Sequence, residues 1–533
     1  MPFARPADTD AAFDVCIVGA GPAGLAAALG CAERGLKVMV LEAGGRMPVP
    51  GEPDLLSADI ADIDAHDPTE LTSAHALGGS SHWWGGRIVP MAPIDVETWP
   101  VSYSEIRRWS DVAAAWLGGC LSEGDAPPPA FARLSNFSAD GDEVWCLERN
   151  VAKRWRARLA EASGPALLLR ARVIGFELQD GSVSKLRVRC GGEVRSVIAR
   201  KYVLACGGLG TLKLLLCAQA ERPELFGGTD GPLGRGYGGH LTGTIAELSF
   251  AHSQDLAAFT PRTLPSGHIA RRQIRARSTA VRDKGAAQIA WWQEQGRGDA
   301  TEFDPVVSSA KLLAARLGRA ITTFGARRDG APLAPHIRRL RQRPVLAAIG
   351  LSKALRRLMA LPSPPVQEGA PPASGSWHLR YHAEQRPGPD NRVALAGSGV
   401  DSAGLPRLSV RLQFSQEDAR AVVKAHQLLD ADLRAAGAGH LVWRASVEAC
   451  TQSVLRYARD GYHQMGGAIM SDEPRRGIVD ADCRVHGLVN LWLASSSVFP
   501  TAGQANPTLT VVALALRLAA HLAGSPGGVP ERR

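Results

Sequence analysis

One stretch near the N-terminus limits what this chain can fold into more than any other. Residues 13–42 read FDVCIVGAGPAGLAAALGCAERGLKVMVLE. The apolar runs at 14–18 and 36–41 predict two buried parallel strands. The alanine-rich segment 25–34 between them predicts a helix. This strand–helix–strand unit indicates an α/β fold built on a parallel sheet.

The glycines of this stretch have separate tasks. Gly19, Gly21 and Gly24 give the pattern GxGxxG at the strand-to-helix turn. The first allows a tight turn, the second lets the backbone approach a pyrophosphate, and the third packs the helix on the strand. Glu42 ends the second strand, where a carboxylate can accept hydrogen bonds from ribose hydroxyls. We therefore expect a dinucleotide cofactor, and the motif alone does not separate FAD from NAD.

The rest of the chain suggests two interleaved domains. Short alternating runs over 166–204 predict an antiparallel meander, and YVLACGGLGTLKLLL then predicts a strand returning to the parallel sheet. Beyond it, WHLRYHAEQRP and NRVALA predict strands of a second sheet, and QEDARAVVKAHQLLDADLRAAG an amphipathic helix. The predicted boundaries are 1–244 for the first part of the cofactor-binding domain and 245–450 for a substrate cap. Residues 451–523 are predicted to return to the cofactor-binding domain, and 524–533 to form a disordered tail.

Charge and cysteine usage exclude some classes of protein. The net charge is +9, but twelve Lys and Arg lie in 309–360 beside one acid. That segment is either a solvated helical face or a dock for an anionic membrane or acidic partner. Nucleic acid is not expected, because no recognition module accompanies the charge. Nine scattered cysteines without a CxxC pair argue against a zinc site and against a disulfide framework, and they suit a reducing compartment. No apolar leader precedes the first strand, so we expect a cytoplasmic protein, with possible peripheral contact at the inner membrane face.

Several ordered blocks together resemble one family, the glucose–methanol–choline (GMC) oxidoreductases. They are GAGPAGLAAA, ALGGSSHWWGG, LACGGLGTLKLLL, PLGRGYGGH, EQRPGPDNRVAL followed by GLPR, and the segment GYHQMGG to GQANPTLT. The resemblance implies a Rossmann-like FAD-binding domain with a parallel sheet and a β-meander. It also implies a substrate-binding domain whose antiparallel sheet is covered by helices.

The resemblance implies roles for particular residues. His463 would be the general base, since a neutral imidazole can take a hydroxyl proton near neutral pH. Asn506 would hold the alcohol over flavin N5. The residues implied to bind FAD are Gly19, Gly21, Ala23, Gly24, Glu42, Ala43, Gly78, Gly79, Ser80, Ser81, Trp84, Val173, Ala205, Gly207, Ser495, Ala505, Asn506, Pro507 and Thr508.

Two departures from the common family pattern narrow the expectation. Ser495 stands where many members have Asp, and Trp84 stands where many have Asn. Both resemble the branch containing sugar and polyol dehydrogenases and pyranose oxidases. In pyranose oxidases the residue before that Trp is a histidine bonded to the flavin. Here that residue is Trp83, with His82 one place earlier, so we predict non-covalent FAD.

These features predict an FAD-dependent enzyme that oxidises the CH–OH group of a sugar, polyol or glycoside, with oxygen or a quinone or other carrier as electron acceptor. The alternatives are a GMC-fold oxidase of a non-carbohydrate alcohol, a redox-silent flavin-containing lyase, or a docking scaffold built on 309–360. Among the other histidines, His240 and His486 are expected to be structural. His75 and His382 are given no role.

Overall fold

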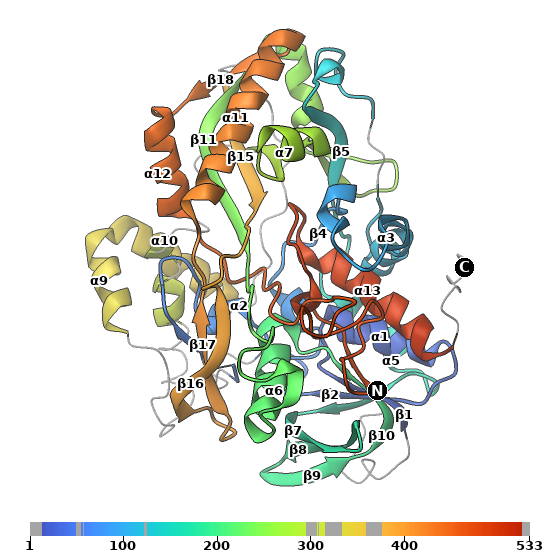
Figure 1. The fold of residues 1–533 in the computed structure, drawn as a ribbon. Coiled ribbons are helices and arrows are strands. Elements are labelled where there is room, and N and C mark those ends of the chain that lie inside the picture. The colour runs from blue at the N-terminus through green and yellow to red at the C-terminus, as the bar shows by residue number, and fades with distance from the viewer. Residues whose placement is uncertain are drawn as a thin grey trace.

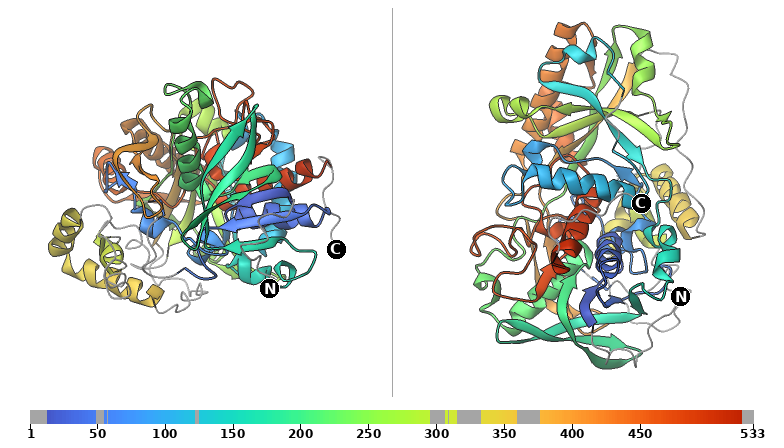
Figure 2. Two further views of the ribbon diagram at one scale, coloured as in Figure 1. Left: turned by 90° about the horizontal axis from the view of Figure 1, so that it is seen from below. Right: turned by 90° about the vertical axis from the view of Figure 1, so that its right-hand side faces the viewer.

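The computed structural model has two regions stacked one above the other, with a parallel sheet in the lower region and an antiparallel sheet in the upper region (Figures 1 and 2). It describes residues 13–48, 55–56, 58–121, 125–294, 306–307, 309–314, 333–358 and 376–524. All nine cysteines lie in these ranges and are free thiols. No described helix has the length and apolar character needed to cross a bilayer.

The lower region is built on a five-stranded parallel sheet with the order β19-β10-β1-β2-β6. Its strands alternate between two cores, as a period of two requires. In β1, for example, Val15 and Ile17 face one core, while Cys16 and Val18 face the other. The strands are β1 (Phe13–Val18), β2 (Val38–Glu42), β6 (Ala166–Leu169), β10 (Ala199–Leu204) and β19 (Leu491–Leu493). The predicted strand–helix–strand unit is confirmed.

Helices cover both faces of the parallel sheet. Helix α1 (Pro22–Ala32) packs against α13 (Pro507–Leu522), which in turn packs on α3 (Tyr103–Leu117). Helix α6 (Gly207–Glu221) belongs to the core on the opposite face. The starts of α1 and α13 come from opposite ends of the sequence, yet Pro22 and Pro507 both line one cleft.

The predicted meander is present as an antiparallel three-stranded sheet. It consists of β7 (Ala171–Gln179), β8 (Ser182–Cys190) and β9 (Glu193–Val197). The run ALLLRARVIGFEL is divided at Arg170, whose φ of 55° breaks the extended backbone. Its first half is β6, which pairs with β2 in the parallel sheet instead of joining the meander.

The upper region is an eight-stranded sheet whose main path is β18-β11-β15-β14-β13-β5-β4, with β12 paired to β13. Helices α11 (Gln416–Ala436), α12 (Val447–Tyr457) and α7 (Ser278–Lys284) contribute to the core beside it. Ser415 caps α11 in a reciprocal box with Asp418. The strands are β4 (Arg87–Ile88), β5 (Phe137–Trp145), β11 (His240–Phe250), β12 (Arg262–Thr263), β13 (Ile269–Ala276), β14 (Ile289–Glu294), β15 (Ser376–Glu384) and β18 (Gly439–Trp443).

Strand pairings cross the predicted domain boundaries. Strands β4 and β5 precede residue 244 yet belong to the upper sheet, and β11 spans that boundary. The prediction that NRVALA joins the same sheet as WHLRYHAEQRP is corrected. It forms β16 (Arg392–Val400), which pairs with β17 (Pro406–Arg411), itself paired to β3 (Ala58–Ile60). The reason is a contact between distant segments, since Val393 pairs with Gly234 and is buried in the core that contains α6.

The structure describes residues 309–314 and 333–358 of the basic segment 309–360. It includes α9 (Ala334–Gln342) and α10 (Pro344–Leu358), which lie at the side of the molecule (Figures 1 and 2). Arg339 forms an ion pair with Asp64 and donates to the carbonyl of Ile63. Apart from Gly524, the predicted tail lies outside the described residues. The remaining short helices are α2 (Thr69–Thr72), α4 (Val151–Arg154), α5 (Arg156–Leu159), η2 (Gly79–His82), η3 (Pro93–Val96), η4 (Phe131–Arg133), η5 (Leu225–Gly227), η6 (Ser253–Phe259) and η7 (Ser496–Val498).

Candidate active site

The glycine turn after β1 is shaped by close backbone approaches. Gly19 has a φ of +105°, and a Cβ built there would lie 2.4 Å from the carbonyl oxygen of Ala205. A Cβ at Gly24 would lie 2.0 Å from the carbonyl oxygen of Gly19. These contacts bring β1, α1 and β10 together with no room for a side chain. The N-terminus of α1, which begins at Pro22, is left open to the cleft beside it.

Glu42 occupies the position expected for a ribose-binding carboxylate. Its side chain is buried, with Oε2 accepting from Ala20 N at 2.8 Å and Oε1 from Gly44 N at 2.9 Å. Burial raises the pKa of this carboxyl above its ordinary value, and the two backbone donors oppose that shift. Glu42 also lines the cleft, where each oxygen has a further lone pair for a ligand hydroxyl.

A single cleft joins the segments predicted to hold the cofactor. Its empty volume is about 1370 Å³, counting the part continuous with solvent. The predicted FAD-binding residues that line it are Gly19, Gly21, Ala23, Glu42, Ala43, Gly79, Ser80, Val173, Ala205, Gly207, Ser495, Pro507 and Thr508. Those that do not line it are Gly24, Gly78, Ser81, Trp84, Ala505 and Asn506. Gly24 instead has the packing role that its place in the motif predicts.

The cleft also has polar lining residues that sequence reasoning missed. Lys213, on α6, is buried and donates to Asp401 at 2.5 Å and to the carbonyl oxygens of Leu55 and Leu56 at 3.2 Å each. Arg172 is paired with the same Asp401. Asp401 lies far from both basic residues in sequence, so no local pattern marks this network.

The loop ALGGSSHWWGGR reaches the cleft through its glycines. Gly78 and Gly79 have φ values of +101° and +51°, and a Cβ at Gly79 would lie 2.7 Å from the Cα of Gly21. The loop therefore lies directly on the glycine turn. Ser81 donates to the carbonyl of Gly78 and accepts from Val151 N, which fixes the loop from inside.

The side chains of His82 and Trp84 in this loop form hydrogen bonds with other parts of the chain. His82 Nε2 lies 3.0 Å from the carbonyl oxygen of Leu77, and the Asn150 amide lies 3.1 Å from Nδ1. The carbonyl can only accept, so Nε2 carries the hydrogen and Nδ1 accepts from Asn150. Trp84 Nε1 donates to the carbonyl of Arg149 at 2.7 Å. Burial lowers the pKa of His82, so this ring is neutral at physiological pH.

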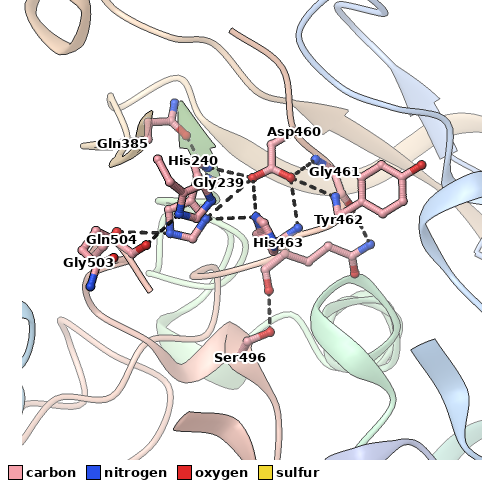
Figure 3. Close-up of polar contacts among 12 residues, drawn as sticks. Gly239, His240, Gln385, Asp460, Gly461, Tyr462, His463, Ser496, Gly503 and Gln504 are labelled. Carbon is pink, nitrogen blue, oxygen red and sulfur yellow. Dashed lines mark hydrogen bonds and ion pairs between the residues drawn. The ribbon is translucent and has the colours of Figure 1, made fainter. Parts of the chain in front are cut away.

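His463 lies just after α12, on a segment organised by the carboxylate of Asp460 (Figure 3). Asp460 Oδ1 accepts from the backbone nitrogens of Gly461, Tyr462 and His463 at 2.7, 3.0 and 3.0 Å. Its Oδ2 lies 3.2 Å from His463 Nδ1. The His463 side chain is 22% exposed, and its neighbours Tyr462 and Gln464 both line the cleft.

Two further histidines lie beside His463. His240 Nδ1 is 3.1 Å from His463 Nδ1, and the rings of His240 and His382 have centroids 4.0 Å apart. Burial lowers the pKa of His382 to about 3 and that of His240 well below its ordinary value, so both rings are neutral. The sequence suggested packing for His240 and no role for His382, yet both lie in the candidate site.

The loop before α13 is held by residues of the upper sheet. His240 Nε2 lies 3.1 Å from the carbonyl oxygen of Gly503, and His382 Nδ1 lies 2.6 Å from that of Gln504. Glu384 accepts from the backbone nitrogens of Ala502 and Gly503. This loop leads directly to Asn506, the N-cap of α13, whose side chain makes no capping bond. His463 and the approach to Asn506 therefore share the same buried histidines.

The remaining expectations concern the serine at position 495, two further histidines, His75 and His486, and metal binding. Ser495 Oγ donates to the carbonyl of Gly207 and accepts from Ser497 N at the cleft wall. His486 lies 2.9 Å from the carbonyl oxygen of Ser471, consistent with its expected structural role, and His75 lines the cleft. No metal site is predicted. Within the described chain, His240, His382 and His463 offer ligand atoms within 4.8 Å of one another.

The residues present fit a bound flavin dinucleotide. The side-chain-free turn at the start of α1, the buried Glu42 carboxylate and the start of α13 all open on one cleft. This donor set suits a pyrophosphate, a ribose and an electron-rich ring edge in turn. Fold and site together define an FAD-dependent oxidoreductase that acts on CH–OH groups.

The comparisons with known proteins agree with this class. Residues 14–49 match the FAD binding domain family, and residues 387–515 match the GMC oxidoreductase family. The chain is 24% identical to paromamine 6'-oxidase of Streptomyces fradiae, covering 97% of this chain and 92% of that protein. It is 23% identical to 6'''-hydroxyparomomycin C oxidase of Streptomyces lividus, covering 97% and 93%. The chain is therefore similar to the GMC oxidoreductases over residues 387–515 and to FAD-binding domains over residues 14–49.

A solved structure shows the same fold. Pyridoxine 4-oxidase from Mesorbium loti superposes with a TM-score of 0.55 over 96% of this chain and 99% of that one, at 17% sequence identity. The likeness extends over both the lower and the upper region, so the two chains share the two-region fold.

Proposed function

We propose that this chain oxidises a hydroxyl-bearing carbon of a sugar-like molecule to a carbonyl, with His463 as general base and Asn506 as the residue that orients the alcohol. One observation carries the proposal. His463 is a partly exposed histidine between two cleft-lining residues, and it contacts His240, which also binds the loop leading to Asn506.

The chemistry divides between the cofactor and the chain. Bound FAD supplies the hydride acceptor, flavin N5. The chain must remove the hydroxyl proton and hold the carbon in place. A neutral imidazole can take that proton, and a side-chain amide can donate a hydrogen bond to the same oxygen. The N–H groups at the start of α13 would face the electron-rich edge of the cofactor.

Two observations support a sugar-like substrate. The relatives that cover nearly the whole chain are named as oxidases of paromamine and of a hydroxyparomomycin, which are sugar-containing molecules. Trp84 also stands where the sugar-oxidising branch of the family carries Trp, and its indole is fixed by the bond to Arg149. Trp84 does not itself line the cleft, but it lies in the loop whose Gly79 and Ser80 do.

The test is a single-turnover reduction assay on the purified holoenzyme. Under anaerobic conditions the loss of visible flavin absorbance is followed after mixing with aminoglycosides, glycosides, polyols, simple sugars and aliphatic alcohols. We expect reduction by at least one sugar-like compound, abolished by His463→Ala. Reduction by aliphatic or aromatic alcohols alone would overturn the substrate class.

The electron acceptor is measured with the same protein. After reduction by substrate, the flavin is reoxidised either with dissolved oxygen or with a soluble quinone, and the two rates are compared. We expect one acceptor to be clearly faster, which separates an oxidase from a dehydrogenase. Equal slow rates with both would point to a dedicated protein carrier.

The flavin is proposed to be held without a covalent bond. Both nitrogens of His82 already contact the protein, and no other histidine lies in the loop. Denaturing the holoenzyme and filtering it should release all of the yellow colour into the filtrate. Flavin retained on the unfolded chain would contradict this.

A further inference from the structure

We infer that Asp460 is a positioning residue that holds His463 as the tautomer with its hydrogen on Nδ1, so that Nε2 is the atom that takes the alcohol proton. The inference rests on the proposed role of His463 as base. It adds a residue that none of the sequence motifs contains, and it assigns the reacting atom.

Asp460 is built into the site as an ionised carboxylate. It is 4% exposed, and its Oδ1 accepts from three successive backbone nitrogens (Figure 3). Its Oδ2 accepts from His240 N at 2.7 Å. Burial alone would raise the pKa of this carboxyl, but the neighbouring His463 and His240 and the backbone donors hold it well below its usual range. The group therefore carries a negative charge at all physiological pH values.

The tautomer of His240 is fixed from its other side. Its Nε2 lies 3.1 Å from the carbonyl oxygen of Gly503, which can only accept. Nε2 must therefore carry the hydrogen. Since the ring is fully buried and neutral, its Nδ1 is a bare lone pair.

His463 Nδ1 then faces two acceptors. It lies 3.1 Å from His240 Nδ1, which carries a lone pair, and 3.2 Å from Asp460 Oδ2. A hydrogen on His463 Nδ1 satisfies this geometry, whereas a lone pair there would leave three acceptors facing one another. The hydrogen is on Nδ1, and the lone pair of the neutral ring is on Nε2.

The surrounding groups also decide what happens when the ring gains a proton. The O–H bond of the alcohol breaks and an N–H bond forms at Nε2, while the hydride passes to FAD as proposed above. The ring then carries one positive charge. The titratable groups that face it are His240 from β11, His382 from β15 and Asp460 from its own segment. The two neighbouring rings are neutral, so Asp460 supplies the compensating charge, as in other base–orienter pairs.

Asp460→Asn is the main test variant, because it keeps the shape and an acceptor for the three backbone nitrogens that bond to Oδ1, while removing the charge. Asp480→Asn is the matched control. Asp480 also accepts from backbone nitrogens two and four residues onward, but it lies outside the site. We expect Asp460→Asn to lower the single-turnover reduction rate about 10²- to 10⁴-fold. FAD content and substrate KM should change little, and the control should stay near wild type.

A pH profile separates positioning from a purely structural role. Loss of the negative charge disfavours protonated His463, so the acidic limb of kcat/KM should move to lower pH while the plateau falls. An unchanged limb together with a wild-type plateau overturns the inference. If His463→Ala is also active, the proposed function itself has failed. If only Asp460→Asn is active, this inference alone has failed.

A second measurement does not depend on the folding of the variant. Wild-type holoenzyme with ¹⁵N-labelled histidine shows which ring nitrogen carries hydrogen by its ¹⁵N shift, and His463→Gln identifies the signal. We expect the Nδ1–H form above neutral pH. The Nε2–H form would overturn the inference even if Asp460→Asn does not fold.

Discussion

His82 and His463 both lie on glycine-flanked segments beside the same cleft, but their partners differ. His82 bonds to a backbone carbonyl through one nitrogen and to an Asn amide through the other, so the loop uses both of its polar atoms. In the described part of the chain, the ring of His463 has its polar contacts on Nδ1, with a buried carboxylate and a neutral imidazole. The comparison predicts that the hydrogen-bond partners of a histidine decide whether its ring fixes a loop or is available for proton transfer.

The strongest test of this comparison is His463→Ala. Removing the base should reduce the rate of flavin reduction by about 10²- to 10⁴-fold, because general-base catalysis contributes that much. The FAD content should be retained, since His463 is not among the residues lining the cleft. Anaerobic stopped-flow absorbance measures the rate, and the ratio of flavin to protein absorbance measures the content. A rate within tenfold of wild type would break the comparison.

Asn506→Ala should have the next largest effect. Loss of one hydrogen bond to the reacting oxygen is expected to lower kcat about 10- to 10³-fold, as for other oxygen-orienting donors. The helix should remain, because the side chain of Asn506 makes no capping bond to α13. Steady-state kinetics gives kcat, and circular dichroism checks the fold. An Asn506→Asp variant that matched wild type would show that no donor is needed here.

The buried rings around His463 predict a smaller, pH-dependent effect on stability. The pKa of His382 is lowered to about 3 in the folded chain, and that of His240 is also lowered. As pH falls below about 6.5, the unfolded chain binds protons that the folded chain does not, so the free energy of unfolding decreases; above that pH these rings contribute no slope. Urea denaturation between pH 7 and pH 4.5 measures the slope.

His382→Gln is the matched variant for that measurement. It removes one titrating ring and keeps a donor for the carbonyl of Gln504. The pH dependence of the free energy of unfolding should become shallower by up to about 1.4 kcal/mol per pH unit, the value for one proton. The same slope in variant and wild type would show that His382 is not buried as a neutral ring.

His82→Ala should give the smallest effect on turnover. It removes one loop contact, and the net value of such a hydrogen bond is about 0.5–1.5 kcal/mol of stability. We expect a reduction rate within about threefold of wild type once FAD is saturating, with a lower melting temperature. A loss as large as that of His463→Ala would make the two histidines equivalent and would sink the comparison.

The parts of the fold that the sequence predicted are those fixed by local patterns. The strand–helix–strand unit follows from apolar period and glycine spacing, and both are confirmed by β1, α1 and β2. The long helix α11 follows from its amphipathic repeat. Each of these depends on residues within about thirty positions of one another, where spacing translates directly into geometry.

Sequence reasoning failed where contacts join distant segments. Asp460 was not singled out, because its partner His240 lies 220 residues away. NRVALA has a strand pattern, but pattern does not say which sheet a strand joins. His382 reads as one residue of β15, and only the fold places it against His240. One local signal was available, namely an acid three residues before the proposed base, a spacing that allows the turn seen at Asp460.

The loop before Asn506 is held by hydrogen bonds from other parts of the chain, and this has a consequence for engineering. Glu384 and His382, from the upper sheet, bind the backbone of residues 502–504, and Trp99 donates to Thr501. Substrate range in such enzymes is an obvious target for exchanging the upper sheet between relatives. In this chain the exchange would also remove the supports of the catalytic loop. A chimera that kept Trp99, His382 and Glu384 would change the residues around the substrate and would leave the loop that leads to Asn506 in its position.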